Sequence, residues 1–385
     1  MFLGHNRLRA GLRARRLRVR DLRPACFITL CSYGTSLEKT FVTSFFRGSK
    51  PVFFKPIQAL SLMSYDCAFV SFFLSLLAGS HDSMSYCLDT HSPVLGSESF
   101  MLQFLDRLAP CIVGPCVYRW ATTQAWCIPD QLDAGIRFFD LRIAHKNIKN
   151  THSTQDLLKT HNTDDTLYFA HAIYTLQTVK EALSTMAVWL EQHQKEVVIL
   201  SCSHFYLLTD SEHQALVCYI TQLFKDKLCP PQETPYLSQC WDLGQQVIIS
   251  YDDETILQQH KELWPKIPYW YADSADPKEV ISYLEERQKA QGRAAHFFTS
   301  GLNLTEDTAV VVCNPCLTMR KLTMKSFSLL LDWVEKQTPG PDLTAVNIIC
   351  GDFVGLNHFA SVVIGLNKKL LKTENQGRSE KETDR

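Results

Sequence analysis

Two histidines and an arginine lie at the ends of short apolar runs in this sequence, and together they could carry out phosphodiester chemistry. His81 and His171 each close such a run, and Arg142 lies near the end of another. One histidine can remove a proton from an attacking hydroxyl while the other protonates the leaving oxygen. An arginine can stabilise charge on the phosphoryl oxygens through two aligned donors. These residue types therefore predict a site that cleaves a phosphodiester.

Further polar side chains occupy the same kind of position, at the end of an apolar run. They are Asp82, Asp140, Ser203, Tyr251 with its neighbour Asp252, and Asp352. Any one of them alone is more simply read as an ordinary loop residue with local hydrogen bonds. Their recurrence at matching positions favours a single shared rim.

The runs that must position these residues alternate with helical patterns. The runs cover residues 136–143, 167–173, 196–203, 246–253, 296–304 and 346–354, with a possible first run at 72–79. Amphipathic helices are predicted at 175–194 and 276–292. Such alternation predicts a parallel sheet, and the number of strands favours a closed α/β barrel over an open sheet. In a barrel the carboxyl ends of all strands open on one face, which is where active sites lie.

Charge and cysteine content limit the partners and the compartment. The formal net charge is −1, but residues 1–24 hold eight arginines and one aspartate, so that −1 − 7 leaves −8 for the rest. This mildly acidic body argues against nucleic acid as a partner and against strong electrostatic docking on anionic lipid. The 14 cysteines are scattered through a large domain, which favours a reducing, cytoplasmic compartment.

The two ends of the chain differ from its body. Residues 1–24 are rich in arginine, as mitochondrial presequences are, but they contain no serine, so a solvated basic arm is the simpler interpretation. The uncharged run at 67–80 is shorter than the ~20 residues that span a bilayer, and a buried strand explains it equally well. The polar tail at 372–385 is expected to be disordered.

Several stretches together resemble the phosphatidylinositol-specific phospholipase C X-domain proteins, and among them the small type that has only the X domain. They are "GSHDSMSYCLD", "QLDAGIRFFDLRIAH", "LYFAHAIY", "HQKEVVIL", "HKELWPKIPYW" and "VNIICGDFVG". The resemblance covers about residues 79–371. It implies an irregular (β/α) barrel of the TIM type, in agreement with the alternation of strands and helices.

The resemblance also implies roles for the residues at the rim. His81 matches the general base that acts on the inositol 2-hydroxyl, and His171 matches the general acid that protonates the diacylglycerol oxygen. Asp82 would orient His171, and Asp352 would orient His81. Because the 2-hydroxyl attacks within the same molecule, the expected first product is a cyclic inositol phosphodiester.

Asp140-Leu-Arg142 resembles the Asp-x-Arg pattern of the bacterial relatives. A guanidinium at this place fills the space of the Ca²⁺ ion that the large eukaryotic enzymes hold, so the resemblance implies catalysis without a metal or other cofactor. Asp140, Ser203 and Tyr251 are expected to contact the substrate. The chain departs from many relatives in having Ser201 and Ser203 where those carry Asp and Asn.

The segment before Gly79 departs from the family as well. Relatives reach the histidine through a strand that reads roughly Asn-Leu-x-Ile-Pro-Gly-Ser-His-Asp, whereas here Ala78 replaces the proline. The Phe/Leu/Ser run consists of residues whose codons are mostly rich in pyrimidines. Followed by Ala-Gly, it has the composition of a translated intron end, with its polypyrimidine tract and AG acceptor. We hypothesise that residues 1–78 are an N-terminal extension from an alternative or mispredicted exon, the alternative being an authentic divergent N-terminus. Transcript reads across the codons of Ala78 and Gly79 distinguish the two.

The sequence therefore predicts a phosphoric diester hydrolase that meets phosphatidylinositol-type lipids at a membrane surface. The alternative is an X domain with little or no activity that binds lipid headgroups or a partner. A third possibility, a glycerophosphodiesterase on a similar barrel, is disfavoured because its Glu-x-Asp metal pattern is not found in the barrel region, residues 79–371.

Overall fold

The computed structural model describes residues 71–146, 166–291, 296–306, 311 and 317–370. The basic arm and the polar tail predicted from the sequence lie outside the described residues. The strands are β1 (Leu77–Ser80), β2 (Phe138–His145), β3 (Leu167–His171), β4 (Ile173–Thr178), β5 (Val198–Tyr206), β6 (Val247–Tyr251), β7 (Tyr269–Trp270), β8 (Thr299–Gly301) and β9 (Ile348–Gly351).

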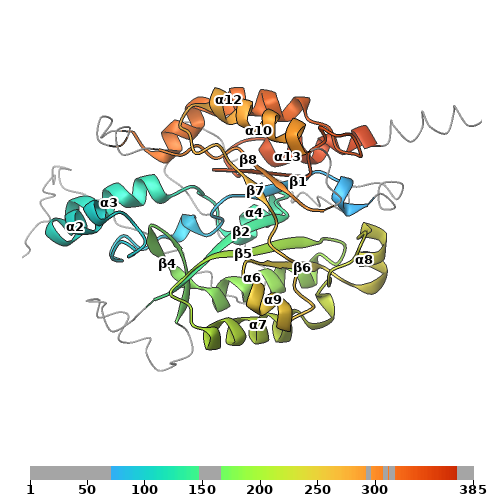
Figure 1. Cartoon of the computed structure of the whole chain (residues 1–385), viewed down its shortest axis with the longest axis horizontal. Coiled ribbons are helices and arrows are strands. Elements are labelled where there is room, and N and C mark those ends of the chain that lie inside the picture. Colours follow the sequence, from blue (N-terminus) through green and yellow to red (C-terminus); the bar gives the residue numbers. More distant parts are fainter. Residues whose placement is uncertain (1–70, 147–165, 292–295, 307–310, 312–316, 371–385) are drawn as a thin grey trace, which may run out of the picture. The chain divides into compact units, whose positions relative to one another are not determined.

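Seven of these strands form one curled parallel sheet, in the order β6-β5-β2-β1-β9-β8-β7. Among the described residues no strand ladder joins β6 to β7. Instead, the Ser250 hydroxyl at the end of β6 donates to the Pro265 carbonyl and accepts from the Ile267 N–H, at 3.0 and 3.2 Å. The sheet is therefore an irregular α/β barrel, as the sequence predicted (Figure 1).

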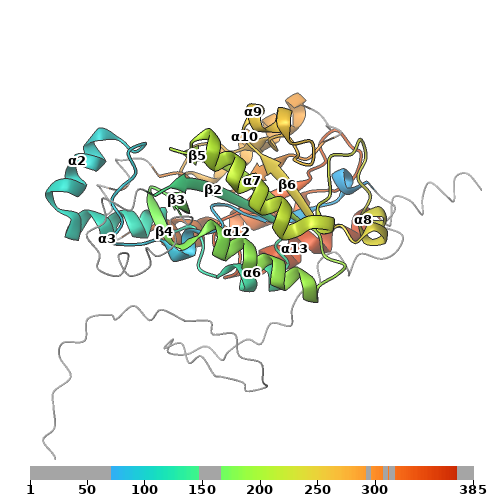
Figure 2. The same cartoon turned by 90° about the horizontal axis from the view of Figure 1, so that it is seen from below.

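Helices cover the sheet on both sides. Figure 1 shows α10, α12 and α13 above the strands and α6, α7 and α9 below them, and Figure 2 shows α2 and α3 beside β4. They are α2 (Phe100–Leu108), α3 (Pro110–Ala121), α4 (Ile128–Asp133), α6 (Val179–Gln192), α7 (Asp210–Phe224), α8 (Leu237–Leu243), α9 (Glu254–Gln259), α10 (Pro277–Gln291), α12 (Met319–Lys336) and α13 (Phe359–Leu366), with short 3₁₀ turns η1 (Phe72–Leu74), η2 (Ser85–Cys87) and η4 (Lys225–Lys227). Across the described part of the chain, no helix is long and apolar enough to cross a membrane.

Two expectations about the middle of the chain were wrong. β3 does not run parallel to β2 but pairs with it antiparallel, and it forms a hairpin with β4. The helix predicted at 175–194 begins only at Val179, because the side chain of Thr178 caps its N-terminus in a capping box with Glu181. The β-branched and aromatic residues Ile173 to Thr175 favour the strand that precedes it.

The segment just before Gly79 is part of the barrel. Leu77 and Ala78 lie in β1 and pair with Ile348 and Ile349 of β9. The side chain of Asn367 bonds both backbone groups of Leu76, at 2.8 and 2.9 Å, so the chain is held in place as it enters β1. The boundary that we placed at residue 79 therefore falls inside a buried strand.

The inward-facing residues of the strands change from apolar to polar along the barrel. At the amino-terminal end the interior holds one layer of apolar side chains, namely Leu77, Phe138, Ile199, Ile248 and Ile348. Because side chains alternate across a strand, the residues two and four positions later face the same way. In β2 the residues two and four positions after Phe138 are Asp140 and Arg142. In β5 the residues two and four positions after Ile199 are Ser201 and Ser203.

Gly79 lies where β1 crosses this layer. A Cβ atom at this position would lie 3.0 Å from both Cys350 Sγ and the Phe138 ring. A side chain here would push Cys350 or Phe138 away by a few tenths of an ångström, so glycine allows the close approach of β1 to its two neighbours without such a shift.

Candidate active site

His81 and Asp352 follow the paired strands β1 and β9 and meet at the rim. The Nδ1 atom of His81 lies 2.8 Å from Asp352 Oδ1, and the His81 backbone N–H donates to the Gly351 carbonyl at 3.1 Å. Both side chains are buried. Since the Asp352 carboxylate accepts from Nδ1–H, the Nε2 atom of His81 is left to face the site.

Gln124 supports this corner from the loop after α3. Its side-chain amide donates to the carbonyls of His81 and Gly351, at 2.8 and 3.0 Å, and its oxygen accepts from the Val354 N–H. The carboxyl ends of β1 and β9 are thereby linked by one buried side chain.

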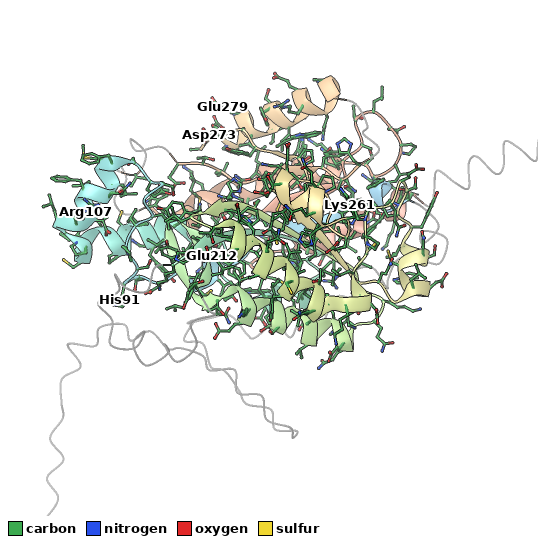
Figure 3. The ribbon with its side chains drawn as sticks, turned by 60° about the horizontal axis from the view of Figure 1, so that its bottom comes forward. His91, Arg107, Glu212, Lys261, Asp273 and Glu279 are labelled. Carbon is green, nitrogen blue, oxygen red and sulfur yellow. The ribbon has the colours of Figure 1, made fainter. Side chains whose placement is uncertain are left out.

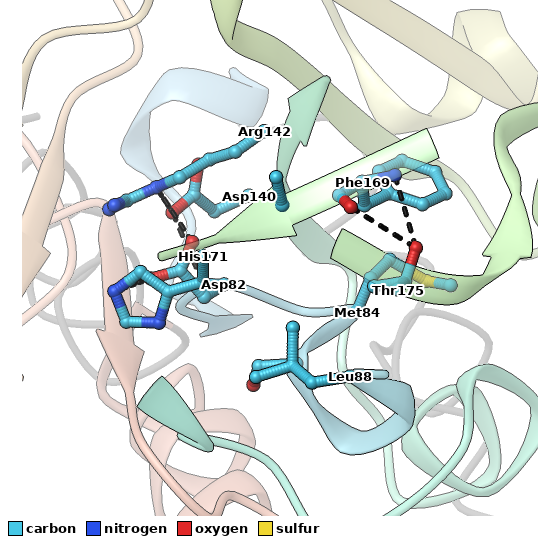
Figure 4. Close-up of a pocket in the computed structure, with 10 residues that line it drawn as sticks. Asp82, Met84, Leu88, Asp140, Arg142, Phe169, His171 and Thr175 are labelled. Carbon is cyan, nitrogen blue, oxygen red and sulfur yellow. Dashed lines mark hydrogen bonds and ion pairs between the residues drawn. The ribbon is translucent and has the colours of Figure 1, made fainter. Parts of the chain in front are cut away.

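Asp82, Asp140 and Arg142 form an ion-paired group beside the histidine. Arg142 Nε lies 2.7 Å from Asp82 Oδ1 and 3.3 Å from Asp140 Oδ2, and the latter atom also accepts from the Asp82 N–H at 3.2 Å. Burial raises the pKa of Asp82, but the charges of Arg142, His171 and His81 outweigh this effect and lower it to about 2. Asp82 is thus held as a carboxylate between the imidazoles of His81 and His171; Figure 4 shows it beside Arg142 and His171.

His171, the last residue of β3, is fixed from its far side. Its Nδ1 atom donates to the Ala121 carbonyl at the end of α3 at 2.7 Å, so that Nε2 points to Asp82 Oδ2 at 3.3 Å. His81 Nε2 lies 3.2 Å from the same oxygen. The two rings are 6.1 Å apart between centroids. The reactive nitrogens of both histidines therefore converge on one carboxylate oxygen.

The state of His81 depends on Arg142. Burial lowers the pKa of His81, but Asp82 and Asp352 raise it more, so the net pKa lies above 6.5. Nη2 of Arg142, however, lies 2.9 Å from His81 Nε2, and this donor needs an unprotonated nitrogen. The geometry therefore corresponds to neutral His81, which would accept a proton readily once Arg142 turns to another acceptor.

Five predicted residues meet in this group: His81, Asp82, Arg142, His171 and Asp352. Two of the expected substrate contacts, Asp140 and Ser203, adjoin this group. Asp140 pairs with Arg142, and Ser203 Oγ donates to Asp140 Oδ1 at 3.5 Å. The small pocket at the centre is lined by Asp82, Met84, Ser85, Leu88, Asp140, Arg142, Phe169, Ala170, His171 and Thr175 (Figure 4).

Tyr251 does not reach this group. It pairs with Cys202, and Cys202 with Leu141, so it lies on the outward face of the sheet. Its hydroxyl donates to His213 Nδ1 on α7 at 2.7 Å, and its side chain is fully buried. Because side chains alternate across a strand, the inward-facing residue beside it is Ser250.

Two residues near the site were not identified from the sequence. His204, directly after Ser203, adopts a left-handed backbone (φ 50°) and bonds Ser203 Oγ through Nδ1 at 2.9 Å. The Tyr269 ring lies 6.0 Å from the His81 ring, and its hydroxyl donates to Asn303 Oδ1. His204 could have been found as the next polar residue at the end of its run, whereas β7 is too short to give a strand signal.

Three groups here also have the donor types of a cation site. Ligand atoms of His81, Asp82 and Asp140 lie within 4.8 Å of one another. The Arg142 guanidinium contacts all three of these residues. A positive charge is thus already held among the same donors.

Comparisons with known proteins show the family of this chain and its fold. A scan against models of protein families finds no match. The PI-PLC X domain-containing protein 1 of Danio rerio is 49% identical over 294 residues, which are 76% of this chain and 90% of that protein. This chain belongs to the PI-PLC X domain-containing protein family. The human protein of the same name is 43% identical over 77% of this chain and 87% of its own length, and member 3 from Danio rerio is 33% identical over 76% and 87%.

Solved structures show the same fold. The phosphatidylinositol-specific phospholipase C from Listeria monocytogenes matches with a TM-score of 0.52 and 16% identity, over 80% of this chain and 97% of that one. A phosphatidylinositol-specific phospholipase C from Staphylococcus aureus matches with a TM-score of 0.52 and 12% identity, over 76% and 92%. At such identities the similarity concerns the barrel alone, so the chemistry must be argued from this chain's own side chains.

Proposed function

We propose that this X-domain protein cleaves the phosphodiester of a phosphatidylinositol-type lipid by acid–base catalysis. The observation that carries the proposal is the arrangement of the two histidines. Each imidazole is held through Nδ1 by a buried acceptor, Asp352 for His81 and the Ala121 carbonyl for His171, while both Nε2 atoms converge on Asp82 Oδ2. One base and one acid with converging nitrogens, and a guanidinium beside the base, suit an acid–base displacement at phosphorus.

In the proposed reaction His81 Nε2 takes the proton of the inositol 2-hydroxyl, whose oxygen attacks the phosphorus. The bond from phosphorus to the diacylglycerol oxygen breaks, and protonated His171 gives its Nε2 proton to that oxygen. The products are diacylglycerol and a cyclic inositol phosphate. Arg142 stabilises the charge on the phosphoryl oxygens, and Asp82 stabilises the positive charge that forms on His81.

We also propose that the reaction needs no metal ion. Support comes from the ion pairs of Arg142 with Asp82 and Asp140, which are the donors that a cation would need. Displacing a guanidinium held by two buried carboxylates would cost several kcal/mol, which a cation would have to recover from the same oxygens. Chelation by EDTA should therefore leave turnover unchanged.

The proposed chemistry limits the substrate to a class of lipids. A headgroup with a free hydroxyl next to its phosphodiester is required for the cyclic product, which fits inositol lipids at a membrane surface. Nucleic acid is not proposed as a partner, because the chain outside its first 24 residues has a net charge of −8. A cytoplasmic location stays a prediction from the cysteine content.

The test is cleavage of phosphatidylinositol by the full chain with EDTA present. His81→Ala and His171→Ala should each lower the rate by ~10²–10⁴-fold, because each removes one proton-transfer group. His91→Ala is the matched control, since 88% of that side chain is exposed (Figure 3). Equal rates in all four proteins would falsify the assignment, and no turnover in the wild type would favour an X domain that only binds headgroups.

A further inference from the structure

Helix α2 is amphipathic in the reverse sense to that of a helix on a soluble protein. Two of its polar side chains contact the protein: Gln103 donates to the carbonyls of Gly96 and Glu98, and Asp106 accepts from the Val94 N–H. None of its nine residues is buried. In a soluble protein the apolar stripe of a surface helix normally faces the core.

The apolar side chains of α2 and of the start of α3 face outward instead. Phe100 is 79% exposed, Leu108 66% and Ile112 70%, and the Phe100 and Phe104 rings stack on each other at 6.3 Å. We call Phe100, Met101, Phe104, Leu105, Leu108 and Ile112 the α2 apolar face. Exposed large apolar side chains that gather on one surface in this way mark an interaction site.

The α2 apolar face is joined to the candidate active site by α3. This helix starts at Pro110, two residues after α2 ends, and it finishes at Ala121, whose carbonyl holds His171. Figures 1 and 2 show the two helices side by side at the end of the barrel where β4 lies. The face and the residue proposed to protonate the leaving group are thus linked by one helix of 12 residues, about 18 Å long.

Exposed cations lie on the helices that carry or adjoin this face, although the body of the chain is acidic and Glu98 and Asp106 also lie at α2. Arg107 is exposed on α2 (Figure 3) and Arg119 on α3. Trp120 of α3 packs against Met319, the first residue of α12. Further exposed cations follow on α12, namely Arg320, Lys321 and Lys325, and neither α3 nor the first eight residues of α12 contain a carboxylate.

We propose that the α2 apolar face docks on an anionic lipid surface, with α2 lying in the membrane interface. Apolar side chains on one side of a helix and cations beside them are the two features that bind interfacial helices to anionic membranes. The proposal rests on the proposed function, because it explains how a lipid headgroup could reach His171 without the lipid leaving the bilayer. The docking itself needs no turnover.

The test measures binding of the full chain to vesicles of phosphatidylcholine and phosphatidylserine that contain no inositol lipid. The double variant Phe100→Ser/Phe104→Ser should bind at least about tenfold more weakly, since two large apolar side chains no longer enter the interface. Arg107→Gln should weaken binding about fivefold, and only when phosphatidylserine is present. Leu243→Ser on α8 is the matched control, because this leucine is 57% exposed on another helix.

The outcomes separate the docking surface from the chemistry. If the wild type does not bind these vesicles, or if the double variant binds as well as the wild type, the proposal is overturned. The proposal would also be overturned if the wild type dimerised through this face while the double variant was monomeric and bound vesicles equally well. That result would favour a second copy of this chain as the occupant of the face. If the double variant loses binding but the wild type cleaves no phosphatidylinositol, the docking stands and the proposed function fails.

A soluble substrate gives the complementary readout. The double variant should keep the wild-type rate on a short-chain phosphatidylinositol below its critical micelle concentration, while its rate on vesicles falls. Equal losses on both substrates would show that the substitutions damage the site and would count against a docking role.

Discussion

Arg142 places Nη2 2.9 Å from Nε2 of His81, so the proposed general base is capped by the cation that is proposed to stabilise the phosphoryl oxygens. The same guanidinium pairs with Asp82 and Asp140 through Nε. A phosphoryl group that draws Arg142 away would expose Nε2 at the moment when a proton has to be removed. Substrate binding and activation of the base are thereby coupled through one side chain.

Arg142→Lys should therefore lower kcat more than it raises KM. A lysine keeps the charge but cannot pair with the carboxylates and the phosphoryl oxygens through a planar fork. We expect kcat on phosphatidylinositol to fall by ~10²–10³-fold, the usual effect of losing one transition-state donor. Steady-state kinetics with EDTA measures it, and a change confined to KM would contradict the role.

Asp352→Asn should change both the rate and its pH dependence. Asp352 is one of the two carboxylates that raise the pKa of His81. Its loss should move the acid limb of kcat/KM to lower pH, because less alkaline conditions then suffice to keep His81 unprotonated. The rate at the optimum should fall by ~10²–10⁴-fold, since the imidazole loses its orienting partner. Asp342→Asn, an exposed change shortly before β9, is the control.

Asp82 should make stability depend on pH below 4. Its folded pKa of about 2 lies below the ordinary 3.8, so its stabilisation is complete above 3.8 and is lost as the pH falls towards 2. The shift corresponds to about 2 kcal/mol. Asp352, whose pKa is raised by burial, contributes with the opposite sign. Urea unfolding of wild type and Asp82→Asn between pH 2 and 6 isolates the difference, and a constant difference would contradict it.

Tyr251→Phe should affect stability and leave catalysis unchanged. The substitution removes the hydroxyl that bonds His213 and leaves that buried ring without one partner. We expect the free energy of unfolding to fall by about 1 kcal/mol. KM for phosphatidylinositol should not change, because Tyr251 faces α7. A raised KM would instead support the contact between Tyr251 and the substrate that the sequence suggested.

Glu196→Ala should be among the most destabilising single substitutions away from the site. Glu196 is 2.8 Å from Arg137 Nε, and both side chains are almost completely buried at the start of the barrel strands. Removing the carboxylate takes away the ion pair of a buried guanidinium, which costs about 3–5 kcal/mol. Thermal unfolding should show this loss for Glu196→Ala and no such loss for Glu191→Ala, an exposed change on α6.

The sequence predicted the parts of this molecule that depend on regular patterns. Apolar runs with a polar residue at the end located β2, β5, β6, β8 and β9 and brought His81, Arg142 and Asp352 to one rim. It did not locate β7, which has only two residues, and it merged β4 with the helix that follows. Neither error moves the rim, because β3 still delivers His171 to it.

Side chains whose position depends on distant contacts could not be predicted in this way. Gln124 lies in a loop and gains its place only by bridging His81 and Gly351, which are far from it in the sequence. The left-handed backbone at His204 likewise has no signal in its residue type. Tyr251 was misplaced because it ends a run just as the others do, and only the register with Cys202 shows its side of the sheet.

The strands on either side of β1 come from opposite parts of the chain. β2 is made soon after His81, but β9 with Asp352 follows 271 residues later, and Asn367, which holds Leu76, comes later still. A nascent chain thus carries His81, the proposed base, long before Asp352 and the paired strand β9 have been synthesised. The proposed site is therefore incomplete until synthesis is almost finished, and a premature stop before β9 removes the strand, the carboxylate and the asparagine in a single event.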